Sequence, residues 1–165
     1  MGFPRPRKSI EPDKKRDPAA VRAAAAGLLA RRDFASGELR DRLAERGFDS
    51  DVVHEAVAEL VAERALDDAR FADNYTGYHA ERGQGPIRIA ADLRLRGLPP
   101  GLIEAAIGAG SDWSARARAA RSRRFGPEAP ASWPEKSRQA RFLQYRGFSS
   151  DHIRAALGTD FNLDD

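Results

Sequence analysis

The sequence predicts an all-α protein made of three tandem three-helix repeats. The tripeptides Arg46-Gly47-Phe48, Arg96-Gly97-Leu98 and Arg146-Gly147-Phe148 recur at a spacing of fifty residues. Four further positions carry matching residues in all three copies: Leu43, Leu93 and Leu143; Val53, Ile103 and Ile153; Ala56, Ala106 and Ala156; Val57, Ile107 and Leu157. No segment alternates as a strand would. Such columns indicate a tandem array, and units this small must stack on one another, which predicts an elongated, curved body.

The first repeat is expected at residues 18–65. Its helices are indicated by apolar residues at helical spacing: Val21, Ala25, Leu28 and Leu29; Leu39 and Leu43; Val53, Val57, Leu60 and Val61. Ser36 and Ser50 are the expected N-caps of the second and third helices. Gly47 should end the second helix, because the residue after a helix often needs a positive φ.

The second repeat is expected at residues 66–110 and opens with Leu66-Asp67-Asp68, whose carboxylates suit a helix N-terminus. Phe71, Tyr75 and Tyr78 share one face of its first helix. Pro86 suits the first position of the next helix. The apolar residues of its last two helices are Ile89 and Leu93, then Leu102, Ile103, Ala106 and Ile107.

The third repeat is expected at residues 111–158. Its first helix should begin near Asp112-Trp113 and end at Gly126-Pro127. The apolar residues of its last two helices are Phe142, Leu143 and Tyr145, then Ile153 and Leu157.

Two terminal segments lack apolar periodicity and are expected to be mobile tails. Residues 1–17 hold six basic and three acidic side chains, whereas the rest of the chain holds 22 of each. Residues 159–165 form an acidic tail. The basic pI of 9.6 therefore reflects one tail and does not by itself predict nucleic-acid binding.

Several classes of function are disfavoured by composition. The chain has no cysteine and no run of about 20 apolar residues that could span a membrane. Its basic N-terminus is not followed by an apolar segment, so no signal peptide is expected and the cytoplasm is the expected location. His54, His79 and His152 share no metal-ligand spacing, and no catalytic constellation or cofactor motif can be assembled. We therefore expect no catalytic residue, cofactor or metal.

Arginines are the best candidates for binding. Arg116, Arg118, Arg121, Arg123 and Arg124 follow one another without a carboxylate on one expected helix, where Arg116, Arg123 and, less closely, Arg124 share a side. This run indicates either contact with a polyanion or acidic protein, or a solvated face. In the second repeat, Arg82, Arg88, Arg94 and Arg96 accompany Tyr75 and Tyr78, and arginine beside an aromatic ring can hold phosphate or a base. The spacing of the tyrosines with Phe71 favours core packing for the rings.

A helix-turn-helix protein acting independently on duplex DNA is the alternative interpretation. It requires third helices that can enter a DNA groove. The third helices of the first two repeats carry acidic residues or prolines, which disfavours their insertion into a DNA groove. These residues are Asp51, Glu55 and Glu59 in the first repeat and Pro99, Pro100 and Glu104 in the second. The third helix of the third repeat carries His152 and Arg154, which disfavour contact with DNA less.

Three motifs together resemble the RecX family. They are Leu66-Asp67-Asp68-x-Arg70-Phe71-Ala72-x-x-Tyr75, Gly83-x-Gly85-Pro86-x-Arg88-Ile89, and Arg141-Phe142-Leu143-Gln144-Tyr145-Arg146-Gly147-Phe148-Ser149. The similarity extends over about residues 19–158. Two positions depart from the family pattern: His79 stands where a basic residue is frequent, and Asp92 replaces a usual glutamate.

The resemblance implies a bacterial, non-enzymatic regulator of the RecA recombinase. Such proteins bind RecA and its filament on single-stranded DNA, and they suppress ATP hydrolysis, strand exchange and repressor cleavage, either at filament ends or along the filament. A monomer with weak direct DNA contact is expected. The candidate contact residues are Arg70, Tyr75, Arg82, Arg88, Arg94, Arg96, Arg116, Arg123, Arg124, Arg141 and Arg146. Arg70 and Arg146 could instead serve as local caps or ion pairs.

Overall fold

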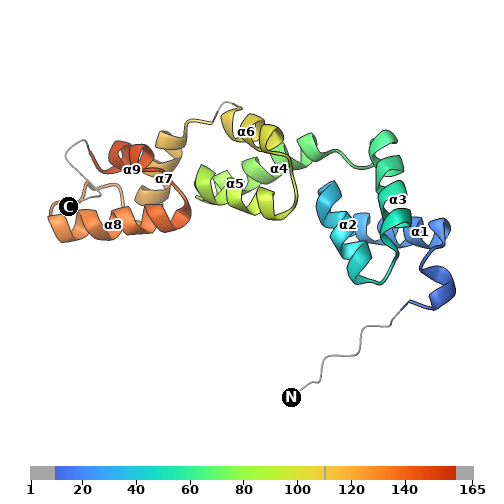
Figure 1. Ribbon diagram of the computed structural model, residues 1–165. Coiled ribbons are helices and arrows are strands. Elements are labelled where there is room, and N and C mark those ends of the chain that lie inside the picture. The colour runs from blue at the N-terminus through green and yellow to red at the C-terminus, as the bar shows by residue number, and fades with distance from the viewer. Residues whose placement is uncertain (1–9, 110, 159–165) are drawn as a thin grey trace, which may run out of the picture. The chain divides into compact units, whose positions relative to one another are not determined.

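The structure, a computed structural model, describes residues 10–109 and 111–158. These residues form nine α-helices, one short 3-10 helix and no strand, which confirms the all-α prediction (Figure 1). The helices are η1 Pro12–Lys14, α1 Pro18–Leu29, α2 Ser36–Glu45, α3 Ser50–Ala62, α4 Asp68–Glu81, α5 Pro86–Leu95, α6 Pro100–Gly108, α7 Trp113–Phe125, α8 Trp133–Arg146 and α9 Ser150–Leu157.

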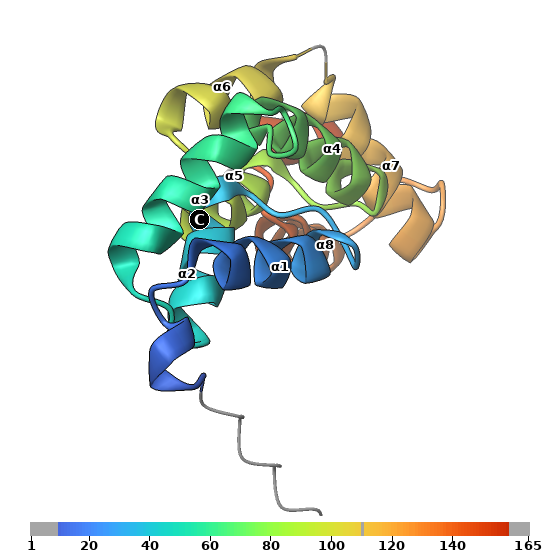
Figure 2. The same cartoon turned by 90° about the vertical axis from the view of Figure 1, so that its right-hand side faces the viewer.

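The chain divides into two compact units, Met1–Phe71 and Ala72–Asp165. In the first unit, α3 packs against α1 and α2, and it crosses α1 steeply in both views (Figures 1 and 2). In the second unit, α5 packs against α6, whereas α7 packs chiefly against α9. The expected bound between the first two repeats, after residue 65, lies near the start of α4. Leu66 itself is buried in the core of the first unit.

The apolar columns of the repeat supply the cores of both units. The buried members of these columns and their neighbours include Leu39, Leu43, Val53, Val57, Leu60, Ile89, Leu93, Ile103, Leu143, Ile153 and Leu157. Val61, which was predicted on the same face, is 46% exposed. It lies at the edge of the stripe that Val57 and Leu60 define, in the last turn of α3, and so escapes burial.

The three repeated glycines end their helices as predicted. Gly47, Gly97 and Gly147 have φ values of +97°, +80° and +94°. The N–H of Phe48 donates to the carbonyl of Leu43 at 3.4 Å, and Phe148 repeats this bond to Leu143 at 3.1 Å. This is the bond pattern of a helix that terminates in a left-handed glycine.

The predicted caps at Ser36 and Ser50 are wrong, because each serine is the first residue of its helix and not the residue before it. The start of α2 is capped from the start of α4. Asp68 accepts the N–H of Ser36 at 2.7 Å through Oδ1 and the Ser36 hydroxyl at 2.6 Å through Oδ2. A carboxylate distant in sequence thus binds the free N–H of the helix, which local spacing could not predict.

The predicted tyrosine packing in α4 is also incorrect. The buried face of this helix runs along Phe71, Ala72, Thr76 and Ala80, while Tyr75 is half-buried and Tyr78 is 53% exposed. Mostly small side chains occupy this buried face, and the two tyrosines lie beside it. Both rings are therefore accessible.

Part of the expected N-terminal tail is structured. The carbonyl of Lys15 accepts the N–H of Asp49 at 3.0 Å, and the Arg16 guanidinium pairs with Asp49 at 3.2 Å. Residues 10–17 thus attach to the first unit and are not the mobile segment that composition predicts. Residues 1–9 and the expected acidic tail at 159–165 lie outside the described residues.

Candidate functional site

Charge is divided unequally between the two units. Residues 72–158 of the second unit carry 14 basic and 8 acidic side chains, whereas residues 10–71 carry 11 basic and 14 acidic ones. In the first unit, four arginines pair with carboxylates, namely Arg16, Arg22, Arg32 and Arg42, and Arg22 reaches Glu59 at 2.6 Å. Among the described residues of the second unit, only Arg154 has such a pair, with Asp151 at 3.1 Å. No carboxylate in the part of this unit that the structure describes pairs with the other arginines.

Aromatic rings take the place of carboxylates beside several of these arginines. Residues of α4 and α5, together with the residue that follows each helix, form what we name the α4–α5 cluster: Tyr75, Tyr78, His79, Arg82, Arg88, Asp92 and Arg96. Helical spacing brings them together, because residues three or four apart share a face.

Tyr75 lies at the centre of this cluster. Its hydroxyl donates to Asp92 Oδ2 at 3.2 Å, and its ring centroid lies 4.7 Å from the Arg96 guanidinium carbon and 4.1 Å from the His79 ring. Arg96 also donates to the Asp92 carbonyl at 3.0 Å. These contacts fix the ring and the guanidinium side by side.

Tyr78 and Arg82 form the outer edge of the cluster. The Arg82 guanidinium carbon lies 3.4 Å from the Tyr78 ring centroid, within the range of a cation–π contact. Arg82 also donates to the Tyr78 carbonyl at 3.3 Å. Its position is thereby set by its own helix, and its remaining N–H groups face no carboxylate of the described residues.

The electrostatics of the cluster favour a bound anion. Burial lowers the pKa of His79, nearby Arg96, Arg82 and Arg88 lower it further, and Asp92 opposes them. Burial likewise raises the pKa of the Tyr75 hydroxyl. At neutral pH both rings are therefore uncharged, and the arginines dominate the local field.

A second group of arginines and rings lines a hollow between α7 and α8, which we name the α7–α8 hollow. It encloses about 610 Å³ and is lined by Arg124, Phe125, Arg138, Arg141, Phe142 and Tyr145. Ser132 caps α8 by accepting the N–H of Glu135 at 3.4 Å, and α7 ends at Gly126 with a φ of +92°. These two termini place Phe125 and Phe142 against each other.

The aromatic rings of the hollow lie close to its guanidinium groups. Phe125 and Phe142 meet edge to face at 5.3 Å, and the guanidinium carbons of Arg124 and Arg138 each lie 5.4 Å from the Phe125 centroid. Tyr145 is 78% exposed, and Arg88 of the α4–α5 cluster lies 5.7 Å from its ring. Arg88 and Tyr145 therefore connect the two groups into one arginine–aromatic surface.

The surface unites most, but not all, of the sequence-predicted residues. Tyr75, Arg82, Arg88 and Arg96 belong to the α4–α5 cluster. Arg124 and Arg141 line the α7–α8 hollow, and Arg146 stands 5.4 Å from the Phe142 ring. These seven share an environment that can stack a planar group and bind negative charge.

Four candidates lie elsewhere. Arg70 belongs to the first unit, and Arg94 projects from α5 on a different side from Asp92, two residues away. Arg116 lies 6.0 Å from the Trp113 ring, and Arg123 donates to the carbonyl of Glu81 at 3.2 Å, at the end of α4. The common side expected for Arg116, Arg123 and Arg124 thus resolves into separate environments.

Arg121 is a structural residue. It is 6% exposed and donates to the carbonyls of Glu128 at 2.8 Å and Pro127 at 3.1 Å, and to the Gln139 side chain at 3.3 Å. Its guanidinium holds the connection between α7 and α8 from inside the unit. It is consequently removed from the surface that the arginine run predicts.

Arg138, Phe125 and Phe142 line the hollow, although no sequence pattern described above predicts them as site residues. One signal was present: Arg138 and Phe142 are four residues apart on one expected helix, the spacing of a shared face. Phe125 could not be found in this way, because it joins them only through packing of α7 against α8.

Two further features of the described residues bear on other classes of function. No helix there combines the length and apolar character that crossing a membrane requires. No group of three or more His, Cys, Asp or Glu side chains in the same residues could hold a metal ion.

Comparison with known proteins identifies relatives of the whole fold. Family models match residues 22–60 as "RecX, first three-helix domain", residues 67–107 as the second and residues 112–157 as the third. The chain is 50% identical over 138 residues to "Regulatory protein RecX" of Halorhodospira halophila, across 83% of this chain and 86% of that protein. It is 38% identical to the protein of the same name from Pseudomonas savastanoi pv. phaseolicola, across 85% and 91% of the two chains.

Solved structures agree on the fold. The crystal structure of RecX from Lactobacillus salivarius superposes with a TM-score of 0.73 at 20% identity, and the match covers 85% of this chain and 94% of that one. The three consecutive domain matches and the identity to curated relatives lead to one conclusion: this chain belongs to the RecX family.

Proposed function

We propose that this protein regulates RecA by binding the recombinase and its filament on single-stranded DNA, with no catalysis of its own. Family membership supports RecA as the partner. The expected consequences are inhibition of RecA's ATP hydrolysis, strand exchange and repressor cleavage, and hence a role in DNA repair and the SOS response. We further propose that it acts as a monomer in the bacterial cytoplasm.

One observation carries the proposed mode of contact: seven arginines of the second unit lie over aromatic rings, and no carboxylate of the described residues pairs with them. An arginine already paired with a carboxylate must break that pair to bind a phosphate. An arginine stacked on a ring keeps its N–H donors in the guanidinium plane free for phosphate or carboxylate oxygens. The exposed rings of Tyr78 and Tyr145 can in addition stack against an unpaired base.

Binding to a filament can suppress turnover in two ways. A protein bound at a filament end blocks addition of the next RecA subunit, so few molecules suffice. A protein that binds along the filament favours a less active arrangement and must approach the RecA concentration to act fully. The stoichiometry of inhibition therefore distinguishes the two.

The test is the DNA-dependent ATPase of RecA, measured on single-stranded DNA while this protein is titrated in. We expect the rate to fall, with half-maximal effect far below the RecA concentration for end blocking and near it for binding along the filament. An unchanged rate at equimolar protein would show that the proposal is wrong.

The duplex-DNA alternative has less support from the third helices. Arg154 on α9 pairs with Asp151, and the His152 side chain accepts the N–H of Ser149 within the helix cap. Both side chains are thus engaged locally. A gel shift at moderate salt, with random and selected duplexes and no RecA, separates the two functions: sequence-selective binding would favour the alternative.

A further inference from the structure

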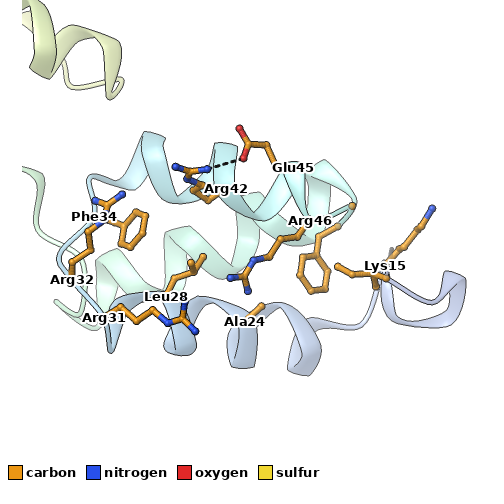
Figure 3. A pocket seen from close by; sticks show the side chains of 12 residues that line it. Lys15, Ala24, Leu28, Arg31, Arg32, Phe34, Arg42, Glu45 and Arg46 are labelled. Carbon is orange, nitrogen blue, oxygen red and sulfur yellow. Dashed lines mark hydrogen bonds and ion pairs between the residues drawn. The ribbon is translucent and has the colours of Figure 1, made fainter. Parts of the chain in front are cut away.

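A groove of about 980 Å³ lies in the first unit, far in sequence from the arginine–aromatic surface. Its apolar lining includes Ala24 and Leu28 on α1 and Phe34 before α2, which Figure 3 labels. Ile10 and Phe48 complete this apolar floor. Basic side chains surround this floor: Lys15, Arg31, Arg32, Arg42 and Arg46, with Glu45 as the one lining carboxylate. The groove thus combines an apolar base with a cationic rim.

Two of the rim arginines are neutralised and two are not. Arg42 pairs with Glu45 at 3.1 Å, and Arg32 pairs with Glu38 at 2.7 Å. No carboxylate of the described residues pairs with Arg31 or Arg46. Figure 3 shows these two side chains reaching over the floor near Leu28 and Ala24, from the ends of α1 and α2. Their free charge is therefore directed at whatever occupies the groove.

The floor does not suit a nucleic-acid base. Phe34 and Phe48 are only 5% and 8% exposed, and the Arg32 guanidinium already lies 3.7 Å from the Phe34 ring centroid. No open ring face is left for stacking.

The remaining fit is to a short protein segment. Apolar side chains can enter the floor, where they bury surface, and carboxylates can meet the two unpaired guanidinium groups. The chain's own residues 1–9 carry three basic and no acidic side chains, so charge disfavours them as the occupant.

We propose that the α1–α2 groove is a docking site for an acidic segment of a partner protein, with apolar side chains against the floor and carboxylates on Arg31 and Arg46. This inference does not rest on the proposed RecA function. It can succeed or fail in an experiment without RecA or DNA.

The experiment measures binding of a fluorescein-labelled peptide to the full chain by fluorescence anisotropy. The peptide is a helix of Glu, Leu and Ala with one acidic and one apolar face. A scrambled peptide of the same composition and a peptide with Lys in place of Glu serve as ligand controls. The variants are Arg31→Glu with Arg46→Glu, and the milder Arg31→Gln with Arg46→Gln. Arg40→Glu, in α2 but outside the groove lining, is the matched control. Thermal unfolding verifies that each variant is folded.

We expect the amphipathic peptide to bind, the double Glu variant to weaken binding about tenfold or more, and Arg40→Glu to change it less than about twofold. Failure of the wild-type chain to bind this peptide, or equal binding of the scrambled peptide, would overturn the proposal. So would displacement of the peptide by a single-stranded oligonucleotide, or a dimer in sedimentation that the groove variants dissociate. Those last results would assign the groove to nucleic acid or to a second copy.

Discussion

The backbone N–H of Gly85 donates to the carbonyl oxygen of Arg146 at 2.8 Å, and so joins the start of α5 to the end of α8. The N–H of Ile87 donates to the Gly147 carbonyl at 3.0 Å beside it. The first N–H groups of a helix lack acceptors and its last carbonyl groups lack donors. At this junction the N–H groups at the start of α5 bind the carbonyl groups at the end of α8, so both needs are met. This junction holds Arg88 next to Tyr145, and with them the two halves of the arginine–aromatic surface.

The junction leaves no room for a side chain at position 147. A Cβ there would overlap the backbone of Arg88, and the φ of +94° adds strain. We expect Gly147→Ala to lower the free energy of unfolding by about 3 kcal/mol or more, measured by chemical denaturation.

Gly47 provides the matched comparison, because it has the same position in the repeat and a φ of +97°, but no atom lies near its missing Cβ. Gly47→Ala should lower the free energy of unfolding by about 1–2 kcal/mol, the strain alone. Equal losses at the two glycines would contradict the close contact at Gly147.

Arg121 should stabilise the second unit through the hydrogen bonds that its buried guanidinium N–H groups donate. A lysine cannot reach two carbonyls and a side-chain amide in the same geometry. We therefore expect Arg121→Lys to reduce the free energy of unfolding by about 2 kcal/mol, in the same denaturation assay. Arg118→Lys, at an exposed position of the same helix, should change it by less than about 0.5 kcal/mol. If Arg121→Lys left the free energy of unfolding unchanged, Arg121 would not have a structural role.

Asp68 should stabilise α2 from outside that helix. Removal of its carboxylate leaves the Ser36 N–H and hydroxyl without their acceptor. Asp68→Ala is thus expected to cost about 1–2 kcal/mol in the free energy of unfolding. Asp73→Ala, at an exposed site on α4, is the control and should have little effect. If both substitutions cost the same, the cap does not contribute.

Stability should depend on pH through His79. Its folded-state pKa is lowered from about 6.5, so the unfolded chain binds this proton more readily. The free energy of unfolding should be fully retained above about pH 6.5 and should decrease as the pH falls below it. The pKa of His152 is lowered in the same direction. His79→Gln should therefore remove part of the slope, and an unaltered slope would contradict burial of His79.

Helix number, order and most core positions could be predicted from the sequence, since apolar period and glycine position are local signals. Gly147 was predicted as a helix end, but not its contact with Arg88, which depends on how two helices meet. Ser36 was misassigned because its acceptor, Asp68, is distant in the chain.

The candidate site was predictable in part. Arg82 and Arg88 could be predicted as site residues because they are arginines close in sequence to tyrosines. Tyr78 itself was expected in the core. Arg121 was grouped with exposed arginines because composition alone cannot distinguish a buried guanidinium that binds carbonyls. The curved stacking of all three repeats remains a prediction.

We propose that the arginine–aromatic surface contacts the RecA–DNA filament. The direct measurement is RecA's DNA-dependent ATPase titrated with wild-type protein, with the double variant Arg88→Glu and Arg138→Glu, and with Arg118→Glu as the matched control on α7. We predict that wild type and control inhibit within about twofold of each other, and that the double variant needs about tenfold more protein. Equal inhibition by the folded double variant would contradict the claim.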